Sequence, residues 1–251
     1  MALEYIEPKI FDKSKIFAGV STRNGSVFPK YGLSLSKAEI LTDSDLNLHR
    51  RTFARLLGVP YDSMKYQKQI HSDIINEIFA DSPVMESDGM FTSVKDLMLN
   101  ISIADCAAVL IHDPINEVVM GIHSGWKGTS QNIVSVGIQR LIDKCGSRPE
   151  DLIVYISPAA SGLVYEVGEE VAKYFPRSVT HLYGDKYLFD NKQEIRLQLM
   201  DCGVLEANIE VSAECTISNY ELHSFRRDKE KSGRMSAFIM MKSEPALAVE
   251  V

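Results

Sequence analysis

The chain has 251 residues, and its 27 lysines and arginines face 34 aspartates and glutamates, so its formal charge is 27 − 34 = −7. This balance disfavours broad nucleic-acid binding, which needs a basic surface to displace counterions. No apolar run approaches the roughly 20 residues that span a bilayer. The first residues carry Glu4 and Glu7 instead of the apolar core of a signal peptide. We therefore expect a cytoplasmic protein with no nucleic-acid or membrane partner.

The apolar pattern predicts a single α/β domain over residues 1–251, in which strands and helices alternate without a strict βαβ rhythm. In its first third we predict a strand, a turn, a helix and an interrupted strand pair, which fall at Ile16–Val20, Asn24–Ser26, Asp43–Leu57 and Tyr66–Phe79. Asp43 or Asp45 is the expected helix cap, and the strand pair is interrupted near His71.

The centre of the chain has the most regular pattern. Leu97–Ile111 is nearly continuous in apolar residues and predicts one buried strand, and Glu117–His123 predicts a second. A glycine-punctuated bend at Ser124–Thr129 leads into a helix from about Ser130 to Lys144. We expect the remaining strands and helices at Leu152–Ile156, Glu169–Phe175 (helix), Asn191–Cys202 (helix), Ile209–Ala213 and Ala237–Met241.

Two histidines and a cysteine lie in loops at predicted strand ends. They are His71, Cys106 and His123, separated by 35 and 17 residues, and the four cysteines of the chain form no C-x-x-C pair. Imidazole nitrogens and one thiolate suit a zinc ion whose fourth position stays open to water, the catalytic arrangement. The alternative is a cysteine that packs as a small hydrophobe beside hydrogen-bonded histidines.

Three positively charged regions are candidates for anion binding. Lys127 lies where a helix begins, a place at which free backbone N–H groups attract anions. Arg23 lies on an early turn, and Arg227 belongs to a cluster with Arg226 and Arg234 that can hold a phosphate bidentately. The alternatives are an ordinary capped turn at Lys127 and a solvated, acid-paired loop at Arg227. His223 lies near this cluster, whereas the other histidines, His49, His112 and His181, indicate solvated or hydrogen-bonded side chains.

Several familiar catalytic motifs are absent. The sequence contains no G-x-x-x-x-G-K-[ST] loop, no G-x-S-x-G elbow and no H-E-x-x-H pair. It also lacks the H-x-E and P-C-x-x-C signature of nucleobase deaminases. Zinc-assisted deamination by this chain therefore requires a different ligand set.

Taken together, the segments resemble the laccase-domain family of the YfiH/YlmD type, formerly called polyphenol oxidases and now regarded as purine nucleoside phosphorylases. The most specific matches are Ala104-Asp105-Cys106 and the H-x-G-W-x-G-T motif of residues 123–129. The others, in order along the chain, are Ser21–Gly25, Gln69–Ser72, Asp88-Gly89, Tyr165–Gly168, Cys215-Thr216, Ser224–Asp228 and Ser232–Met235.

The resemblance implies an α/β sandwich of mixed β-sheets flanked by helices. It also implies that His71, Cys106 and His123 are the zinc ligands and the catalytic centre, with copper as a second metal for the same site. The implied substrates are phosphate and the nucleosides adenosine, inosine, guanosine and methylthioadenosine, with adenosine deamination as a second activity.

The chain departs from the family pattern at substrate-binding positions. Ser34 replaces the asparagine of an Asn-Leu pair, and Lys127 replaces an arginine. We expect Arg23 and Arg227 to position phosphate, Lys127 to be a second option, and Ser34 to contact substrate. We expect Asp105 to point away from Cys106, by alternation along a strand, and to orient a histidine.

Three other classes of function fit the same residues. Two histidines and a cysteine also describe a blue-copper site, as in a copper-dependent polyphenol oxidase. A cysteine hydrolase would use Cys106 as nucleophile and His123 as base. A non-catalytic zinc-stabilised binding module would have a closed site with four protein ligands.

Overall fold

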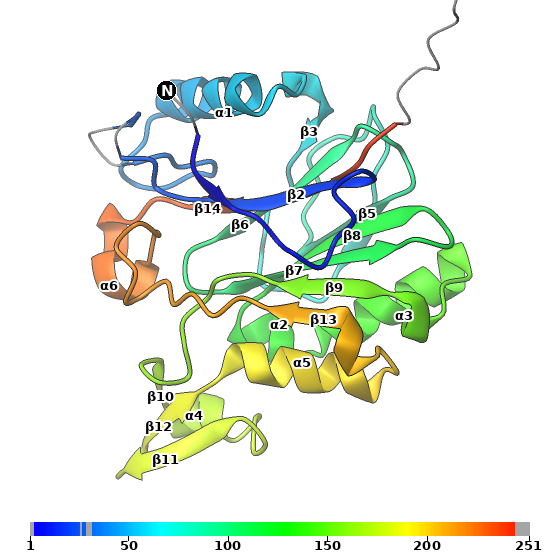
Figure 1. The fold of residues 1–251 in the computed structure, drawn as a ribbon. Coiled ribbons are helices and arrows are strands. Elements are labelled where there is room, and N and C mark those ends of the chain that lie inside the picture. Colours follow the sequence, from blue (N-terminus) through cyan, green and yellow to red (C-terminus); the bar gives the residue numbers. More distant parts are fainter. Residues whose placement is uncertain (1–2, 26, 29–31, 244–251) are drawn as a thin grey trace, which may run out of the picture.

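A computed structural model describes residues 3–25, 27–28 and 32–243 (Figure 1). Four layers are stacked: helix α1, a five-stranded sheet, a six-stranded sheet, and helices α3 and α5 (Figure 1). The helices are α1 Asp43–Leu57, α2 Trp126–Ser130, α3 Ile133–Cys145, α4 Glu169–Ala172, α5 Asn191–Asp201 and α6 Phe225–Asp228. Short 3₁₀ turns lie at Tyr61–Ser63, Pro149–Asp151, Glu206–Asn208 and Lys229–Lys231.

Both large sheets mix parallel and antiparallel pairs. The five-stranded sheet has the order β1-β2-β14-β6-β3, comprising Tyr5–Ile6, Ile16–Ser21, Met235–Met241, Met98–Ile103 and Met64–Lys65. The six-stranded sheet has the order β13-β9-β7-β8-β5-β4, comprising Ile209–Val211, Ile153–Ile156, Ala107–Asp113, Val118–Ser124, Gly89–Thr92 and Ile75–Glu77. Pairs β3/β6, β4/β5 and β13/β9 are parallel. The predicted α/β fold of mixed sheets flanked by helices is confirmed.

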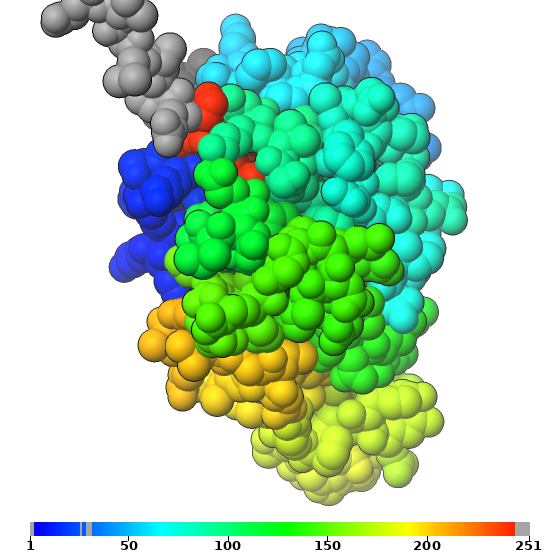
Figure 2. All heavy atoms as spheres, turned by 90° about the vertical axis from the view of Figure 1, so that its right-hand side faces the viewer, coloured from blue at the N-terminus to red at the C-terminus, as the bar shows by residue number. Residues whose placement is uncertain are grey.

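A small third sheet lies at one end of the molecule. It has the antiparallel order β10-β12-β11, comprising Glu166–Gly168, Lys186–Phe189 and Val179–Tyr183, and the sequence did not predict these strands. Val171 of helix α4 and Phe175, which follows the helix, join Phe189 of this sheet in one hydrophobic cluster. In the view turned by 90°, this yellow-green unit projects below the helices of the sandwich (Figure 2).

Strand β7 is buried on both faces, which explains its continuous apolar run. Ala108 and Leu110 pack against the five-stranded sheet, whereas Val109 and Ile111 pack toward α3 and α5. Helix α1 covers the outer face of the five-stranded sheet through Phe53. Its cap is Thr42, not the expected aspartates, because Thr42 and Asp45 form a reciprocal capping box.

Two predicted elements are each divided in the structure. Leu97–Ile111 is not one strand, because residues 104–106 turn the chain from β6 in one sheet to β7 in the other. The predicted helix after Ser124–Thr129 begins earlier, at Trp126, and is broken where Asn132 adopts a left-handed backbone with φ of 56°. The predicted pair over Tyr66–Phe79 is mostly irregular and contributes only β4. Part of the predicted turn at Asn24–Ser26 lies outside the described residues, because Ser26 is not among them.

Within the described ranges, none of the helices combines the length and the apolar character that crossing a membrane requires.

His223 connects two loops through hydrogen bonds of both ring nitrogens to the backbone. Its Nε2 donates to the carbonyl of Leu33 at 2.8 Å, and its Nδ1 accepts the N–H of Gly233 at 3.2 Å. A Cβ at Gly233 would lie 2.6 Å from the ring, so only glycine fits there. Burial lowers the pKa of His223 to about 4, so the neutral ring is the form that the fold holds.

We predict that the free energy of unfolding decreases as the pH falls from about 6.5 toward about 4. In this range the histidine of the unfolded chain is protonated, whereas buried His223 in the folded chain stays neutral. His223→Gln should flatten this dependence in urea denaturation between about pH 7 and about pH 5. Buried His112, whose pKa is also lowered, will keep part of the slope. His181→Gln, at an exposed position, is the control. An unchanged slope in the His223 variant would contradict this assignment.

Candidate metal centre

The two sheets bring His71, Cys106 and His123 to one place. One ligand atom from each lies within 4.8 Å of the others. Cys106 immediately precedes β7 and His123 is near the end of β8, and the antiparallel register pairs Ala107 with Ser124. His71 comes from the irregular segment before β4 and has a left-handed backbone with φ of 60°. Cys106 and His123 therefore lie at neighbouring strand ends, with which their spacing is compatible, whereas His71 comes from a loop.

A buried carboxylate, Asp88, holds both histidines. Its Oδ1 accepts from His123 Nδ1 at 2.8 Å, which leaves Nε2 of that ring for the site. Its Oδ2 accepts from the backbone N–H of Ser72 at 2.6 Å, from the Ser72 hydroxyl at 2.8 Å and from the N–H of Ile70 at 3.2 Å. Asp88 thus fixes one histidine directly and the other through both of its chain neighbours.

The charges of the site favour a thiolate. Burial raises the pKa of Cys106, but the hydrogen bonds and charges of His123 and His71 outweigh it and bring the value to about 6. Burial lowers the pKa of His123, and Cys106 and Asp88 outweigh it, raising the value to about 9. Asp88 stays ionised, because its bonds with His123 and Ser72 overcome burial and lower its pKa to about 2. A thiolate is the form of cysteine that binds metals.

Gly125 makes room for the thiolate. A Cβ at this position would lie 2.5 Å from the Sγ of Cys106 and 3.6 Å from Cδ2 of His71. The first glycine of the H-x-G-W-x-G-T motif is therefore required by the close approach of the backbone to the candidate ligands.

The three side chains also line a cavity of about 590 Å³, called here the metal-site cavity. In the described part of the chain, the cluster contains these three residues and no fourth histidine, cysteine or carboxylate ligand. Two imidazoles, one thiolate and an approachable fourth position fit a catalytic zinc site better than a closed structural one. Copper accepts the same donors.

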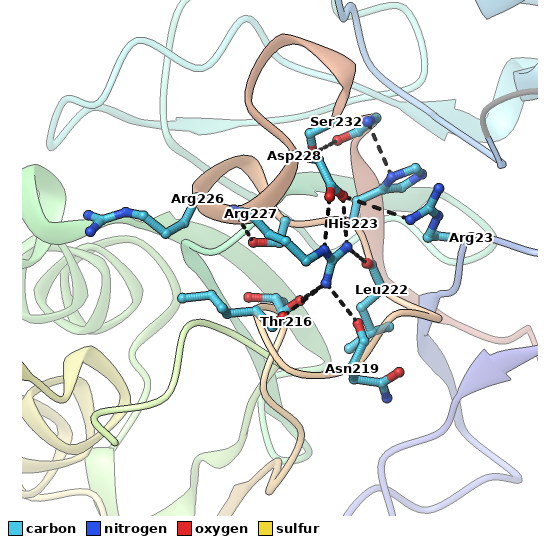
Figure 3. Close-up of polar contacts among 12 residues, drawn as sticks. Arg23, Thr216, Asn219, Leu222, His223, Arg226, Arg227, Asp228 and Ser232 are labelled. Atoms are coloured by element: carbon cyan, nitrogen blue, oxygen red, sulfur yellow. Dashed lines mark hydrogen bonds and ion pairs between the residues drawn. The ribbon is translucent and has the colours of Figure 1, made fainter. Parts of the chain in front are cut away.

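Arg227 does not contact the metal-site cavity. Its guanidinium donates to Asp228 and to the carbonyls of Thr216, Ile217, Asn219 and Leu222, as Figure 3 shows for most of these contacts. Arg23 lies 3.8 Å from the same aspartate, and Arg226 points away from this group (Figure 3). The structure thus uses the Arg227 guanidinium to fix loops within the chain, and it places Arg23 beside Asp228 and outside the lining of the metal-site cavity.

Lys127 and Ser34 also lie outside the cavity lining. Lys127 is exposed, with its Nζ 5.7 Å from the ring centre of Trp126. Ser34 is fully buried, and its hydroxyl accepts the N–H of Arg234 at 2.9 Å and donates to the carbonyl of Ser36 at 3.2 Å. Ser34 therefore connects its own loop to Arg234, and its side chain is not accessible to a substrate.

The expected role of Asp105 is wrong. Its Oδ1 accepts from the Thr216 hydroxyl at 2.7 Å and its Oδ2 from the N–H of Arg226 at 2.5 Å, and neither oxygen bonds a histidine of the described ranges. The alternation argument fails because Asp105 lies in a turn with φ of 91° and not in a strand. Asp88 orients the histidine instead. The matched pair Asp88-Gly89 was the only sequence signal for it.

The metal-site cavity has cationic walls, of which the sequence analysis had singled out only Arg234, in its arginine cluster. Its lining includes Arg50 from α1 and Arg234 from the loop before β14, together with Lys37 and Lys68. Helix α1 belongs to the opposite outer layer, so no local pattern connects Arg50 with the histidines.

Comparison with known proteins identifies the family. A family model described as "Multi-copper polyphenol oxidoreductase laccase" matches residues 17–242. The chain belongs to this family. It is 30% identical to "Purine nucleoside phosphorylase YlmD" of Bacillus subtilis, over 92% of this chain and 90% of that protein. It is 34% identical to "Purine nucleoside phosphorylase CA_C1699" of Clostridium acetobutylicum, over 70% of this chain and 76% of that protein.

Solved structures share the fold. YlmD from Geobacillus stearothermophilus superposes with a TM-score of 0.87 and 26% identity over 94% of both chains. Bacillus licheniformis YfiH superposes with a TM-score of 0.85 and 27% identity, over 90% of this chain and 93% of that chain. The resemblance to the YfiH/YlmD family is therefore confirmed.

Asp88→Asn should weaken zinc binding by about 10- to 100-fold, because the neutral amide no longer fixes the tautomer of His123 or offers the Ser72 N–H a charged acceptor. Competition with a chromophoric chelator measures this. Asp73→Asn, at a nearby exposed position, should bind zinc as the parent protein does. Equal zinc affinity in both variants would contradict the role of Asp88 in orienting His123 for metal binding.

Gly125→Ala should lower the zinc content of the purified protein far below one ion per chain, since the new methyl group and the Sγ of Cys106 cannot both keep their positions. Metal analysis and thermal unfolding measure the result. Gly25→Ala is the matched control, because a Cβ there meets nothing within 4 Å. Full zinc content in the Gly125 variant would show that the site has more room than described.

Proposed function

We propose that this protein is a zinc-dependent purine nucleoside phosphorylase that acts on adenosine, inosine, guanosine and methylthioadenosine, with adenosine deamination as a second activity. The observation that carries the proposal is a three-ligand centre that faces a cationic cavity large enough for a nucleoside. The relatives named as purine nucleoside phosphorylases support it. Purine nucleosides and inorganic phosphate are the proposed partners.

The cavity has the properties of a nucleoside site. Its volume of about 590 Å³ falls within the range typical of small-molecule sites. Tyr66 and Phe225 give it aromatic surface, and Leu46 and Val84 give it aliphatic surface for a purine. The same cavity contains cationic side chains, which phosphate requires.

Phosphorolysis needs a bound anion beside the sugar. An oxygen of phosphate forms a bond to C1′ while the bond from C1′ to the purine nitrogen breaks. The electron pair of that bond leaves with the purine, which takes up a proton, and ribose 1-phosphate remains. The role of the protein is to hold phosphate and nucleoside in line and to stabilise the charge that develops between them.

In this proposal His71, Cys106 and His123 hold zinc, and Asp88 keeps His123 in the tautomer that binds it. Zinc bound there supplies Lewis-acid chemistry. In deamination, water replaces the 6-amino group of adenosine, so the C6–N bond breaks, ammonia leaves and inosine forms.

Product analysis tests the proposal. Zinc-loaded protein is incubated with adenosine, with and without phosphate, and the products are identified by mass spectrometry. We expect adenine and ribose 1-phosphate only with phosphate, and inosine under both conditions. Cys106→Ala and chelator-treated protein should lose both activities by at least about 100-fold. Full phosphorolysis by metal-free Cys106→Ala protein would overturn the zinc assignment.

A cysteine hydrolase is the second candidate, because Asp88, His123 and Cys106 are linked in the order of a catalytic triad. In that case iodoacetamide would abolish activity and a chelator would leave it intact. A copper-dependent phenol oxidase, which the family description names, would instead oxidise phenols only when loaded with copper.

A further inference from the structure

We propose that Arg50 and Arg234 form the subsite that binds the phosphate group in the metal-site cavity. The inference rests on the proposed function and adds to it the residues that recognise the anion. It places the phosphate on these residues instead of on Arg23 and Arg227, which do not line the cavity, and the guanidinium of Arg227 is occupied within the chain.

The lining of the cavity is selectively cationic. It includes Lys37, Arg50, Lys68 and Arg234, and none of the described lining residues is an aspartate or a glutamate. The chain as a whole carries a formal charge of −7, so the positive charge of the cavity lining is opposite in sign to the net charge of the protein. An excess of positive charge around a cavity attracts an anionic ligand.

The two arginines differ from the two lysines in their partners. Lys68 pairs with Glu86 at 2.7 Å, and Lys37 lies 3.8 Å from Asp43 on the exposed surface. Neither Arg50 nor Arg234 has a carboxylate partner among residues 3–25, 27–28 and 32–243. Their positive charges are therefore available to an anionic ligand.

One short segment fixes both arginines. The carbonyl of Leu35 accepts from Arg50 Nε at 2.8 Å, and the N–H of Leu35 donates to the carbonyl of Arg234 at 2.9 Å. The hydroxyl of Ser34 accepts the N–H of Arg234 at 2.9 Å. Ser34 is thus a positioning residue, since it acts on the site through Arg234.

Aromatic rings hold the guanidinium groups. Arg50 lies 3.7 Å from the ring centre of Tyr66, and Arg234 lies 5.3 Å from that of Phe225. Nη1 of Arg234 donates to the carbonyls of Ser232 and Gly233 at 2.9 Å. Among described residues, the two Nη atoms of Arg50 and the Nε and Nη2 of Arg234 have no acceptor. These preorganised donors suit the oxygens of a phosphate.

Gln67 also lines the cavity, but its amide nitrogen is not open to it. The Nε2 of Gln67 is buried and has no hydrogen-bond partner among the described residues, although its Oε1 accepts from Ser87 at 2.8 Å. This nitrogen is covered by the chain, so the anion contacts of the proposed subsite come from the two arginines.

The test compares Arg50→Gln with Arg51→Gln in zinc-loaded protein. Arg51 is the next residue of α1 and lies 4.4 Å from the ring centre of Tyr61, but it does not line the cavity. Calorimetry measures the binding of inorganic phosphate, and steady-state kinetics measure KM for phosphate and for adenosine. Arg50→Gln and Arg234→Gln should each weaken phosphate binding by about 10- to 100-fold. Arg51→Gln should not.

The two readouts separate this inference from the proposed function. Arginine-dependent binding of phosphate without nucleoside cleavage would support the subsite and refute the phosphorylase. Phosphate-dependent cleavage with an unchanged KM for phosphate in both the Arg50 and Arg234 variants would refute the subsite alone. The subsite would also be refuted if the protein bound adenosine 5′-monophosphate in an arginine-dependent way but did not bind inorganic phosphate. Arg234→Lys, which keeps the charge, gives a second reading where Arg234→Gln fails to fold.

Discussion

The carboxylate of Asp88 is the constraint on which the candidate metal centre depends. A buried charge is tolerable only when it is fully hydrogen-bonded, and Asp88 satisfies this condition with His123 on one oxygen and the Ile70–Ser72 backbone on the other. The same bonds that stabilise the charge orient one imidazole and hold the loop of the other. The cost of burying Asp88 is thus offset by contacts that also shape the site.

The rest of the fold places Cys106 beside the histidines and builds the opposite wall of the cavity. The antiparallel register of β7 and β8 sets Cys106 beside the chain that follows His123, and Gly125 lets them approach. The five-stranded sheet and α1 contribute the opposite wall, where Leu35 ties Arg50 and Arg234 together. The candidate metal ligands and the proposed phosphate site therefore come from different layers, and both line the cavity between them.

The sequence predicted those features that local pattern determines. Continuous apolar runs indicated the buried strands, and loops at predicted strand ends singled out His71, Cys106 and His123 as candidates, which the structure brings together. It did not reveal that Ala104–Cys106 passes between two sheets, because this turn contains neither glycine nor proline. Nor could it show that Arg227 is occupied by carbonyl oxygens while Arg50 faces the cavity. Local spacing carries no information about such tertiary contacts.

X-ray absorption at the zinc edge tests the centre most directly. For zinc-loaded protein the account predicts one sulfur at about 2.3 Å and two imidazole nitrogens at about 2.0 Å, with one further light atom from solvent. The sulfur contribution should disappear in Cys106→Ala. A spectrum with two or more sulfurs, or with zinc and sulfur unchanged in that variant, would contradict the assignment of His71, Cys106 and His123 as the metal ligands.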